Sequence, residues 1–210
     1  MSFYIQIGAG GGDLDEISNF KDGFTNFLKK KGLKNDDKIL IVEANPLNLD
    51  KLKDCWKNFK NLKILNLAIV DKKFENENIK IYYTDDDKPC YQVSSVFKEH
   101  VVKHYPKSKI LTKNVQSKRI NDFLMDETKK IPIEYLAIDA EGLDFDLVMD
   151  IDFDIFEIKN ISIEFLHLNK QSKKQLIQRL IDKGYSYSGS GFDVRGYDFM
   201  FTKKMNFYLK

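Results

Sequence analysis

The sequence predicts an α/β fold: an open, mostly parallel sheet with helices on both faces and a C-terminal antiparallel hairpin. Three observations support this prediction. Short apolar segments alternate with segments of helical periodicity along the 210 residues, which is the pattern of a parallel sheet. A glycine-rich segment, Gly8–Gly12, separates the first expected strand from the first expected helix. Two strand-like segments joined by a glycine-containing loop lie near the C-terminus, as in a hairpin.

The first half of the chain shows strand and helix in alternation. Strands are expected over residues 3–7, 38–42 and about 62–69. The second of these is almost wholly apolar, as expected of a strand that helices cover on both faces. Asp13 and Glu16 predict the capped start of the first helix. Asn45-Pro46 predicts the start of the second helix, with proline at its first position.

The second half continues this pattern after a less regular segment. Strands are expected over residues 79–83, 133–138, 160–165, 185–188 and 197–202. Helices are expected within 95–104 and 120–124, after Gly142, and over a segment that Ser172 and Gln175 cap and Gly184 ends. No linker composition interrupts residues 71–125. We therefore interpret that segment as an insertion on the substrate side of one domain, which spans residues 1–210.

The composition excludes several classes of protein. Lys and Arg number 34 and Asp and Glu 32, and a net charge of +2 argues against a dedicated nucleic-acid binder. No apolar run approaches the roughly 20 residues that a membrane span needs, and the N-terminal residues do not resemble a signal peptide. Cys55 and Cys90 are too few for a disulfide framework and are typical of a reducing compartment. We expect a soluble, cytoplasmic protein.

The glycine-rich segment carries the first chemical signal. Glycines after a strand let backbone N–H groups approach a ligand closely, and ligands of open α/β sheets bind beyond the carboxyl ends of the strands. A dinucleotide fingerprint counted from Gly8 requires glycine at position 13, where this chain has Asp13. A carboxylate at a helix start repels a pyrophosphate. The segment therefore predicts a zwitterionic or cationic ligand.

Glu43 carries the second signal, because it stands at the end of the second expected strand. A carboxylate in this position accepts hydrogen bonds from the two hydroxyls of a ribose. Both Glu43 and the glycine-rich segment are expected at the same edge of the sheet. Together they predict a nucleoside-containing ligand.

Four segments, in this order, resemble the FkbM-type methyltransferases: residues 7–12, 42–46, 66–68 and 138–142. The resemblance covers nearly the whole chain and implies a Rossmann-like class I methyltransferase fold with S-adenosylmethionine as cofactor. It implies cofactor contacts from Gly8, Ala9, Gly10, Gly12, Glu43, Ala44, Ala68 and Asp139. Of these, the glycines would cradle the methionine portion, Glu43 would hold the ribose, and the segment around Ala68 would border the adenine. The chain departs from the family pattern at Gln6, where an acid is common, and at Gly10, where asparagine is frequent.

Four residues are candidates for catalysis: Asp139, Glu141, Glu164 and His167, which all follow expected strand ends. One or two of them would orient an acceptor hydroxyl and take its proton. Alternatively, Asp139 and Glu141 cap the following helix. The four residues could also hold a divalent metal, but their spacing is not that of a ligand set, and we predict no metal site. His100 and His104 are interpreted as surface residues of a short helix.

The leading prediction is an S-adenosylmethionine-dependent O-methyltransferase acting on a small hydroxylated molecule, such as a saccharide or glycoconjugate. One alternative is a non-catalytic nucleoside-binding module with the same fold. Another is a nicotinamide-dependent dehydrogenase, against which Asp13 and the terminal hairpin both count. The 71–125 insertion would shape the acceptor pocket, and its sequence carries no readable code for the acceptor.

Overall fold

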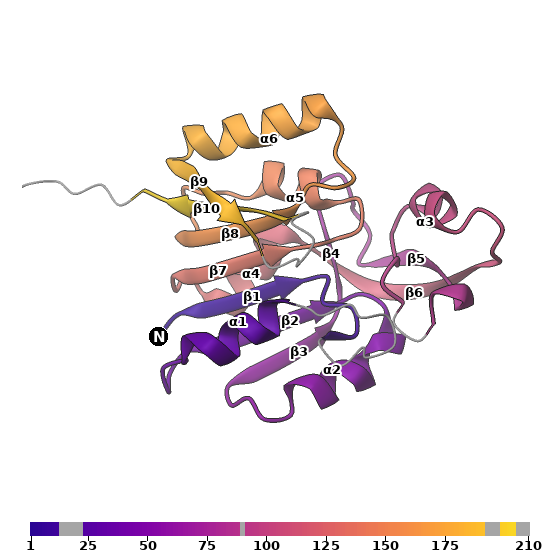
Figure 1. Ribbon diagram of the computed structural model, residues 1–210, viewed down its shortest axis with the longest axis horizontal. Helices are drawn as coiled ribbons and strands as arrows, with labels where there is room; N and C mark the ends of the chain where they lie inside the picture. The colour runs from indigo at the N-terminus through magenta and orange to yellow at the C-terminus, as the bar shows by residue number, and fades with distance from the viewer. Residues whose placement is uncertain (13–22, 89–90, 192–197, 205–210) are drawn as a thin grey trace, which may run out of the picture.

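A seven-stranded sheet forms the centre of the computed structural model, which describes residues 1–12, 23–88, 91–191 and 198–204 (Figure 1). Its strands are β1 (Phe3–Ile7), β2 (Lys38–Glu43), β3 (Leu62–Asn66), β7 (Ile133–Ile138), β8 (Ile158–Glu164), β9 (Tyr185–Ser190) and β10 (Asp198–Lys203). Their order is β3-β2-β1-β7-β8-β10-β9, and the neighbours from β3 to β8 all pair in parallel. The last strand, β10, lies antiparallel between β8 and β9. The predicted fold class is confirmed.

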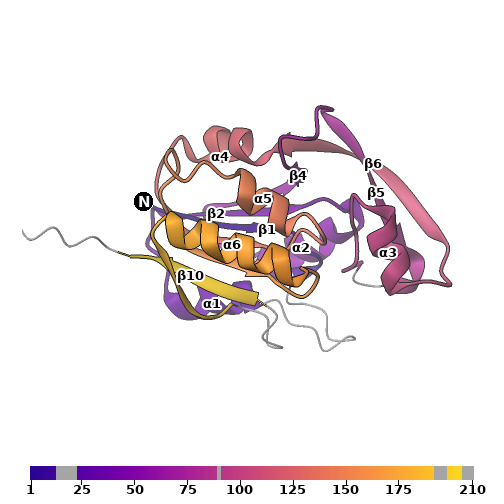
Figure 2. The same cartoon turned by 90° about the horizontal axis from the view of Figure 1, so that it is seen from above.

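Helices cover both faces of this sheet. They are α1 (Gly23–Lys31), α2 (Leu49–Trp56), α4 (Ile120–Thr128), α5 (Asp144–Asp150) and α6 (Lys170–Asp182). Alternate residues of β1 point to opposite faces, as strand geometry requires. Tyr4 joins the apolar cluster of Phe24 and Trp56, whereas Ile5 joins the cluster of Leu147 and Leu176. Figure 2 accordingly shows α1 and α4 on opposite sides of β1 and β2.

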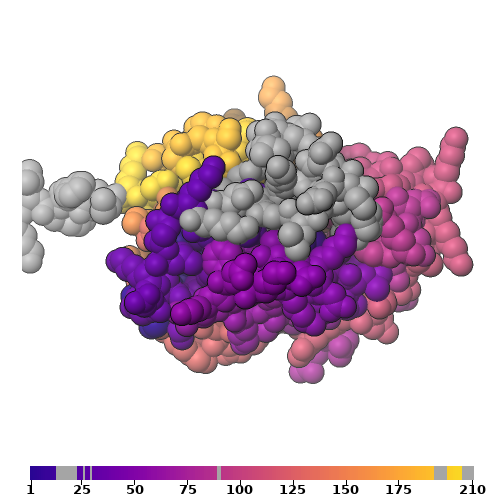
Figure 3. Space-filling model, turned by 60° about the horizontal axis from the view of Figure 1, so that its bottom comes forward, coloured from indigo at the N-terminus to yellow at the C-terminus, as the bar shows by residue number. Residues whose placement is uncertain are grey.

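Most of the segment interpreted as an insertion, together with β4 (Ala68–Val70) just before it, forms a second, smaller sheet beside one end of the main sheet (Figure 1). This segment contains β5 (Asn78–Thr84), the short 3-10 helix η3 (Asp85–Asp87), α3 (Lys98–His104) and β6 (Ile110–Arg119). The strand order is β4-β6-β5. In Figure 3, the segments of α1 and α2 form the near face and the insertion forms one end of the molecule.

One prediction for this region was wrong, and one strand was missed. The single strand expected over 62–69 is two strands, because the Leu67 N–H donates to the Glu43 carbonyl and the Asn66 side chain donates to the carbonyls of Glu43 and Ala44. These bonds turn the chain out of the main sheet into β4. Strand β6 was not predicted, because it has few apolar residues among its polar ones and most of its residues are at least partly exposed.

Of the predicted helix starts, one is confirmed and another was wrong. The second helical segment begins as expected, since Asn45 caps the 3-10 turn η2 (Pro46–Asn48) by accepting from the Leu47 N–H at 3.1 Å. Helix α6, however, begins at Lys170, and its cap is Asn169, so the capping box expected at Ser172 was wrong. Asp13, Glu16 and Cys90 lie outside the described residues, and Cys55 is a buried free thiol. No helix in the described ranges has the length and apolar character that crossing a membrane requires.

Candidate active site

A cavity of about 460 Å³ lies at the carboxyl ends of β1, β2, β7 and β8. Its wall on the other side comes from the insertion, through residues 92–94, His104 and Tyr105. Every residue that the sequence predicts for the site lines this cavity: Gly8, Ala9, Gly10, Gly12, Glu43, Ala44, Ala68, Asp139, Glu141, Glu164 and His167. The fold therefore brings all of them together, and the role of each one stays a prediction.

The glycines of the first loop serve two different purposes. Gly8 has a φ of +80°, and a β-carbon there would lie 1.6 Å from the Asp139 carbonyl oxygen. Only glycine permits β1 to end this close to the end of β7. Gly10 has a φ of +53°, and its β-carbon would meet nothing within 4 Å. The backbone at Gly10 is thus open to a ligand, whereas Gly8 is required by the protein's own packing.

Glu43 is fixed by main-chain donors at the end of β2. It is 5% exposed, and its Oε2 accepts from the Gly10 N–H and its Oε1 from the Asn45 N–H, both at 2.7 Å. The Asn48 amide adds a third bond at 3.3 Å. Burial raises the pKa of Glu43 to about 7, although these donors oppose the shift. The carboxylate holds the glycine loop in place. Oε1 already accepts two bonds, whereas Oε2 accepts one and retains a lone pair for a further donor.

The turn after β7 presents two carboxylates to the cavity. Its backbone is held by Asp144, whose side chain accepts from the N–H groups of Ala140 at 2.7 Å and Gly142 at 3.1 Å. The sequence offered Asp139 and Glu141 as caps of the following helix, but the side chain that binds the N–H groups at its start is that of Asp144. Glu141 has a φ of +44°, a costly conformation for a residue with a side chain and one that is concentrated at functional sites.

The cavity gathers acidic side chains. Burial raises the pKa of Asp139 well above its usual range, and the charges of Glu141, Glu164 and Asp198 raise it further. Burial likewise raises the pKa of Glu141 to about 8. None of the described residues that line the cavity is a lysine or an arginine. Asp139 Oδ1 and Gln6 Oε1 are both buried, and within the described chain neither has a hydrogen-bond partner. The cavity is suited to a cation that donates hydrogen bonds.

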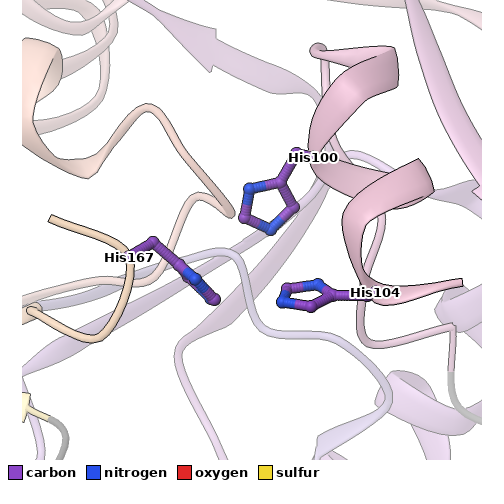
Figure 4. Close-up of side chains that lie close together, drawn as sticks. All are labelled: His100, His104 and His167. Carbon is purple, nitrogen blue, oxygen red and sulfur yellow. The ribbon is translucent and has the colours of Figure 1, made fainter. Parts of the chain in front are cut away.

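Three histidines meet beside these carboxylates (Figure 4). His100 Nε2 lies 2.7 Å from Glu141 Oε2, and His167 Nε2 lies 3.6 Å from Glu164 Oε2. The interpretation of His100 and His104 as surface residues was wrong, because both rings pack against the His167 ring. Their spacing of four residues on α3 places them on one helix face. That spacing was the one sign in the sequence that the His100 and His104 rings lie together, and it does not show what this helix face packs against.

Residues 6–187 match the family model described as the methyltransferase FkbM domain. The chain belongs to this family. The resemblance predicted from the sequence is confirmed, and the family is one of methyltransferases. No curated protein sequence matches the chain.

Solved structures with a similar fold share little sequence with this FkbM chain. Fibrillarin of Aeropyrum pernix, in complex with natively bound S-adenosyl-L-methionine, matches 96% of the chain at 10% identity with a TM-score of 0.44. The fibrillarin pre-rRNA processing protein of Methanococcus jannaschii gives the same identity and TM-score. Precorrin-6y C5,15-methyltransferase of Geobacter metallireducens GS-15 matches 96% of the chain and 80% of its own at 12% identity, with a TM-score of 0.41. The chain spans 64% and 66% of the two fibrillarins.

Some cavity residues of this FkbM chain carried no sequence signal. They are Ile81, Gln92, Val93, Val96, Leu166 and Asp198. Asp198 reaches the site because β10 pairs antiparallel with β8, which places it opposite Glu164. The others come from segments that the fold joins across long stretches of chain, and no local pattern marks them.

Proposed function

We propose that this FkbM protein transfers a methyl group from S-adenosylmethionine to a hydroxyl oxygen of a small molecule, such as a saccharide or glycoconjugate. When bound, S-adenosylmethionine supplies an electrophilic methyl group on a positively charged sulfur. A cytoplasmic location also stays a prediction.

The observation that carries this proposal is the charge of the cavity. Its lining includes Glu43, Asp139, Glu141, Glu164 and Asp198, and no lysine or arginine among the described residues. A sulfonium or ammonium group lowers the pKa of these acids and is stabilised by their ionised forms, whereas a pyrophosphate raises their pKa further and meets no cationic side chain among the described lining residues. This counts against the nicotinamide dehydrogenase alternative, because NAD carries a pyrophosphate.

Two buried acceptors are suited to the ammonium group of the cofactor. Gln6 Oε1 and Asp139 Oδ1 line the cavity with no partner within the described chain, and a buried polar atom is costly unless it is paired. Where relatives have an acid, Gln6 still offers an acceptor. On this proposal the two atoms accept N–H bonds from the methionine portion.

Glu43 is suited to the ribose. Its two oxygens are already oriented by main-chain donors on either side, so binding costs little further ordering of the side chain. Ala44 and Ala68 line the neighbouring wall with small side chains, which leaves room for the flat adenine ring.

Glu141, Glu164 and His167 are suited to the acceptor. They lie together at the side of the cavity nearest the insertion, where His104 and Tyr105 also line the wall. Burial raises the pKa of Glu141 to about 8, which makes it a stronger base than an exposed carboxylate. On this proposal one of the three takes the hydroxyl proton and the others orient the acceptor.

Calorimetry tests the cofactor assignment. We expect S-adenosylmethionine and S-adenosylhomocysteine to bind and NAD not to bind, and we expect Asp139→Asn to weaken S-adenosylmethionine more than S-adenosylhomocysteine, which lacks the sulfonium charge. NAD binding in preference to both would overturn the proposal.

Turnover tests the remaining alternative. A panel of hydroxylated metabolites and glycans is incubated with methyl-labelled S-adenosylmethionine and the folded protein. Label transfer to an acceptor oxygen supports the methyltransferase. Cofactor binding without transfer to any member of a broad panel supports the non-catalytic nucleoside-binding module instead.

A further inference from the structure

All three histidines of the chain meet at one place. His100 and His104 come from α3, and His167 comes from the segment after β8 (Figure 4). Their ring centroids lie 4.8 Å apart for His100 and His104, 4.7 Å for His100 and His167, and 4.9 Å for His104 and His167. The elements that carry them are distant in sequence, so the cluster is a product of the fold.

The three rings offer a set of ligand atoms. One nitrogen of each ring lies within 4.8 Å of those of the other two. Carboxylate oxygens of Glu141 and Glu164 lie within the same distance of one another and of His167. An ion held at roughly 2.0–2.1 Å from each nitrogen requires these atoms to be roughly 3.4 Å apart, so side-chain rotations that bring them closer by at most about 1.4 Å suffice.

We propose that His100, His104 and His167, together with Glu141, bind a divalent first-row transition-metal ion such as Zn²⁺. Imidazole nitrogens suit zinc, iron, copper and nickel, whereas Mg²⁺ and Ca²⁺ prefer oxygen ligands. This donor set differs from the one considered for the sequence, which lacked two of the three imidazoles and favoured a hard ion.

The surroundings of the rings also suit an ion. His104 Nδ1 is buried with no hydrogen-bond partner in the described chain, and the neighbouring carboxylates supply compensating negative charge.

The place of the cluster also suggests a role for the ion, and this part rests on the proposed methyl transfer. His104 and His167 line the cavity that holds the predicted cofactor residues. A bound ion would act there as a Lewis acid: it would coordinate the acceptor hydroxyl oxygen and lower the pKa of that hydroxyl, and Glu164, which is outside the ligand set, would take the proton. The oxidation state of the ion does not change.

Histidine-selective NMR on tag-free wild-type protein tests the site. The chain has three histidines, so the spectrum of the folded protein should contain three imidazole environments. We expect one equivalent of Zn²⁺ to shift all three and one equivalent of Co²⁺ to broaden them and produce visible absorption, whereas Mg²⁺ leaves them unchanged. If Zn²⁺ and Co²⁺ leave any of the three signals unchanged, the proposed site is wrong.

Variants locate the ion. We expect His104→Ala and His167→Ala each to weaken Zn²⁺ binding at least about 100-fold, measured in competition with a chromophoric chelator, since even changes around a ligand cost 10–100-fold. The control is Asp126→Asn, which removes an exposed carboxylate of α4. Circular dichroism checks that each variant folds. Unchanged affinity in both folded histidine variants places the ion elsewhere and overturns the proposal.

Calorimetry with S-adenosylmethionine on the same wild-type protein separates this inference from the proposed function. Zn²⁺-induced shifts without cofactor binding would sustain the metal site and overturn the proposed function. Cofactor binding without histidine shifts would overturn the metal site alone. Where both ligands bind, removal of the ion by a chelator should abolish methyl transfer and leave cofactor affinity unchanged, and full activity of the metal-free enzyme would exclude the catalytic role.

Discussion

The strand-end half of the cavity consists of Gly8–Gly12, Glu43, Ala44, Ala68 and Asp139, and backbone hydrogen bonds hold it in place. The insertion half consists of residues 92–94, His104 and Tyr105 of the insertion, together with Glu141 and His167 beside them, and side-chain bonds join it to the sheet. Glu43 receives main-chain N–H groups from two loops, and the Asp139 N–H donates to the Ile7 carbonyl at 3.0 Å. The parallel sheet fixes these groups directly.

The insertion half is joined to the sheet by a few side-chain bonds. Ser95 Oγ donates to the Glu141 carbonyl at 2.7 Å, and the Asn45 amide donates to Ser94 Oγ at 2.9 Å. A segment attached in this way can change its residues without disturbing the strand ends. On the proposed function, S-adenosylmethionine lies against the rigid backbone of the strand-end half. The acceptor, which can vary, lies against the insertion half, whose residues can change.

The largest effect that separates the two halves is expected at the turn after β7. Glu141→Gln should lower turnover about 10²–10⁴-fold, the range for loss of acid–base catalysis, because Glu141 either takes the hydroxyl proton or helps to hold the group that activates the hydroxyl. It should leave the Kd of S-adenosylmethionine nearly unchanged. Asp139→Asn should instead raise that Kd tenfold or more, since a hydrogen bond to a charged group contributes about 1.5–3 kcal/mol. Single-turnover methyl transfer and calorimetry on both variants provide the measurement. If Glu141→Gln weakens the cofactor as much as Asp139→Asn does, Glu141 belongs to the cofactor side and the division is wrong.

The next largest effect concerns stability within the strand-end half. Gly8→Ala should lower the free energy of unfolding by about 3 kcal/mol or more, because the new β-carbon combines a clash with the Asp139 carbonyl oxygen and left-handed strain. Gly10→Ala is the matched control: its β-carbon enters open space, and only the strain of about 1–2 kcal/mol remains. Urea unfolding of the two variants measures the difference. Equal losses would show that the contact at Gly8 does not decide its identity.

These two glycines also show why the strand-end half was predictable from sequence. Residues 8–12 directly follow an apolar strand, and Glu43 is the last residue of another. Carboxyl ends of parallel strands meet at one edge of a sheet, so local patterns were enough to bring the groups together. The sequence did not reveal that Gly8 serves packing and Gly10 leaves space, because that difference depends on the Asp139 carbonyl of a distant strand.

The insertion half was not predictable for a related reason. Strand β6 alternates polar residues with few apolar ones, so its pairing with β4 and β5 left little signal. His100 and His104 share a helix face, but the ring that covers this face, His167, belongs to another part of the chain. Asn66 ends β3 through bonds to carbonyls of β2 and the residue after it, which no local pattern encodes. Side-chain contacts between distant segments decided each of these features.

A smaller effect is expected from Glu43→Ala. It should weaken S-adenosylmethionine by about 1.5–3 kcal/mol, the range for hydrogen bonds to a charged group, through loss of the ribose acceptor. It should also destabilise the fold, because the buried N–H groups of Gly10 and Asn45 lose their acceptor. Calorimetry and urea unfolding measure both. Unchanged affinity in a folded variant would remove the ribose assignment, and unchanged stability would show that the loop finds other partners.

The smallest effect is a pH dependence that belongs to the strand-end half alone. Glu43 has its pKa raised to about 7, and ribose hydroxyls donate to its ionised form, so binding lowers this pKa. Affinity should therefore rise with pH up to about 7 and then level off, by about tenfold between pH 6 and pH 8 when only the carboxylate binds. The ligand should be 5′-methylthioadenosine, which carries the nucleoside without the charged groups that Asp139 and Glu141 would sense. Glu43→Gln keeps the shape of the side chain and removes its titration, so its affinity should be lower and flat over this range. A wild-type affinity that does not change between pH 6 and pH 8, or that falls, would show that Glu43 binds no ribose hydroxyl and that its buried carboxylate serves the glycine loop alone.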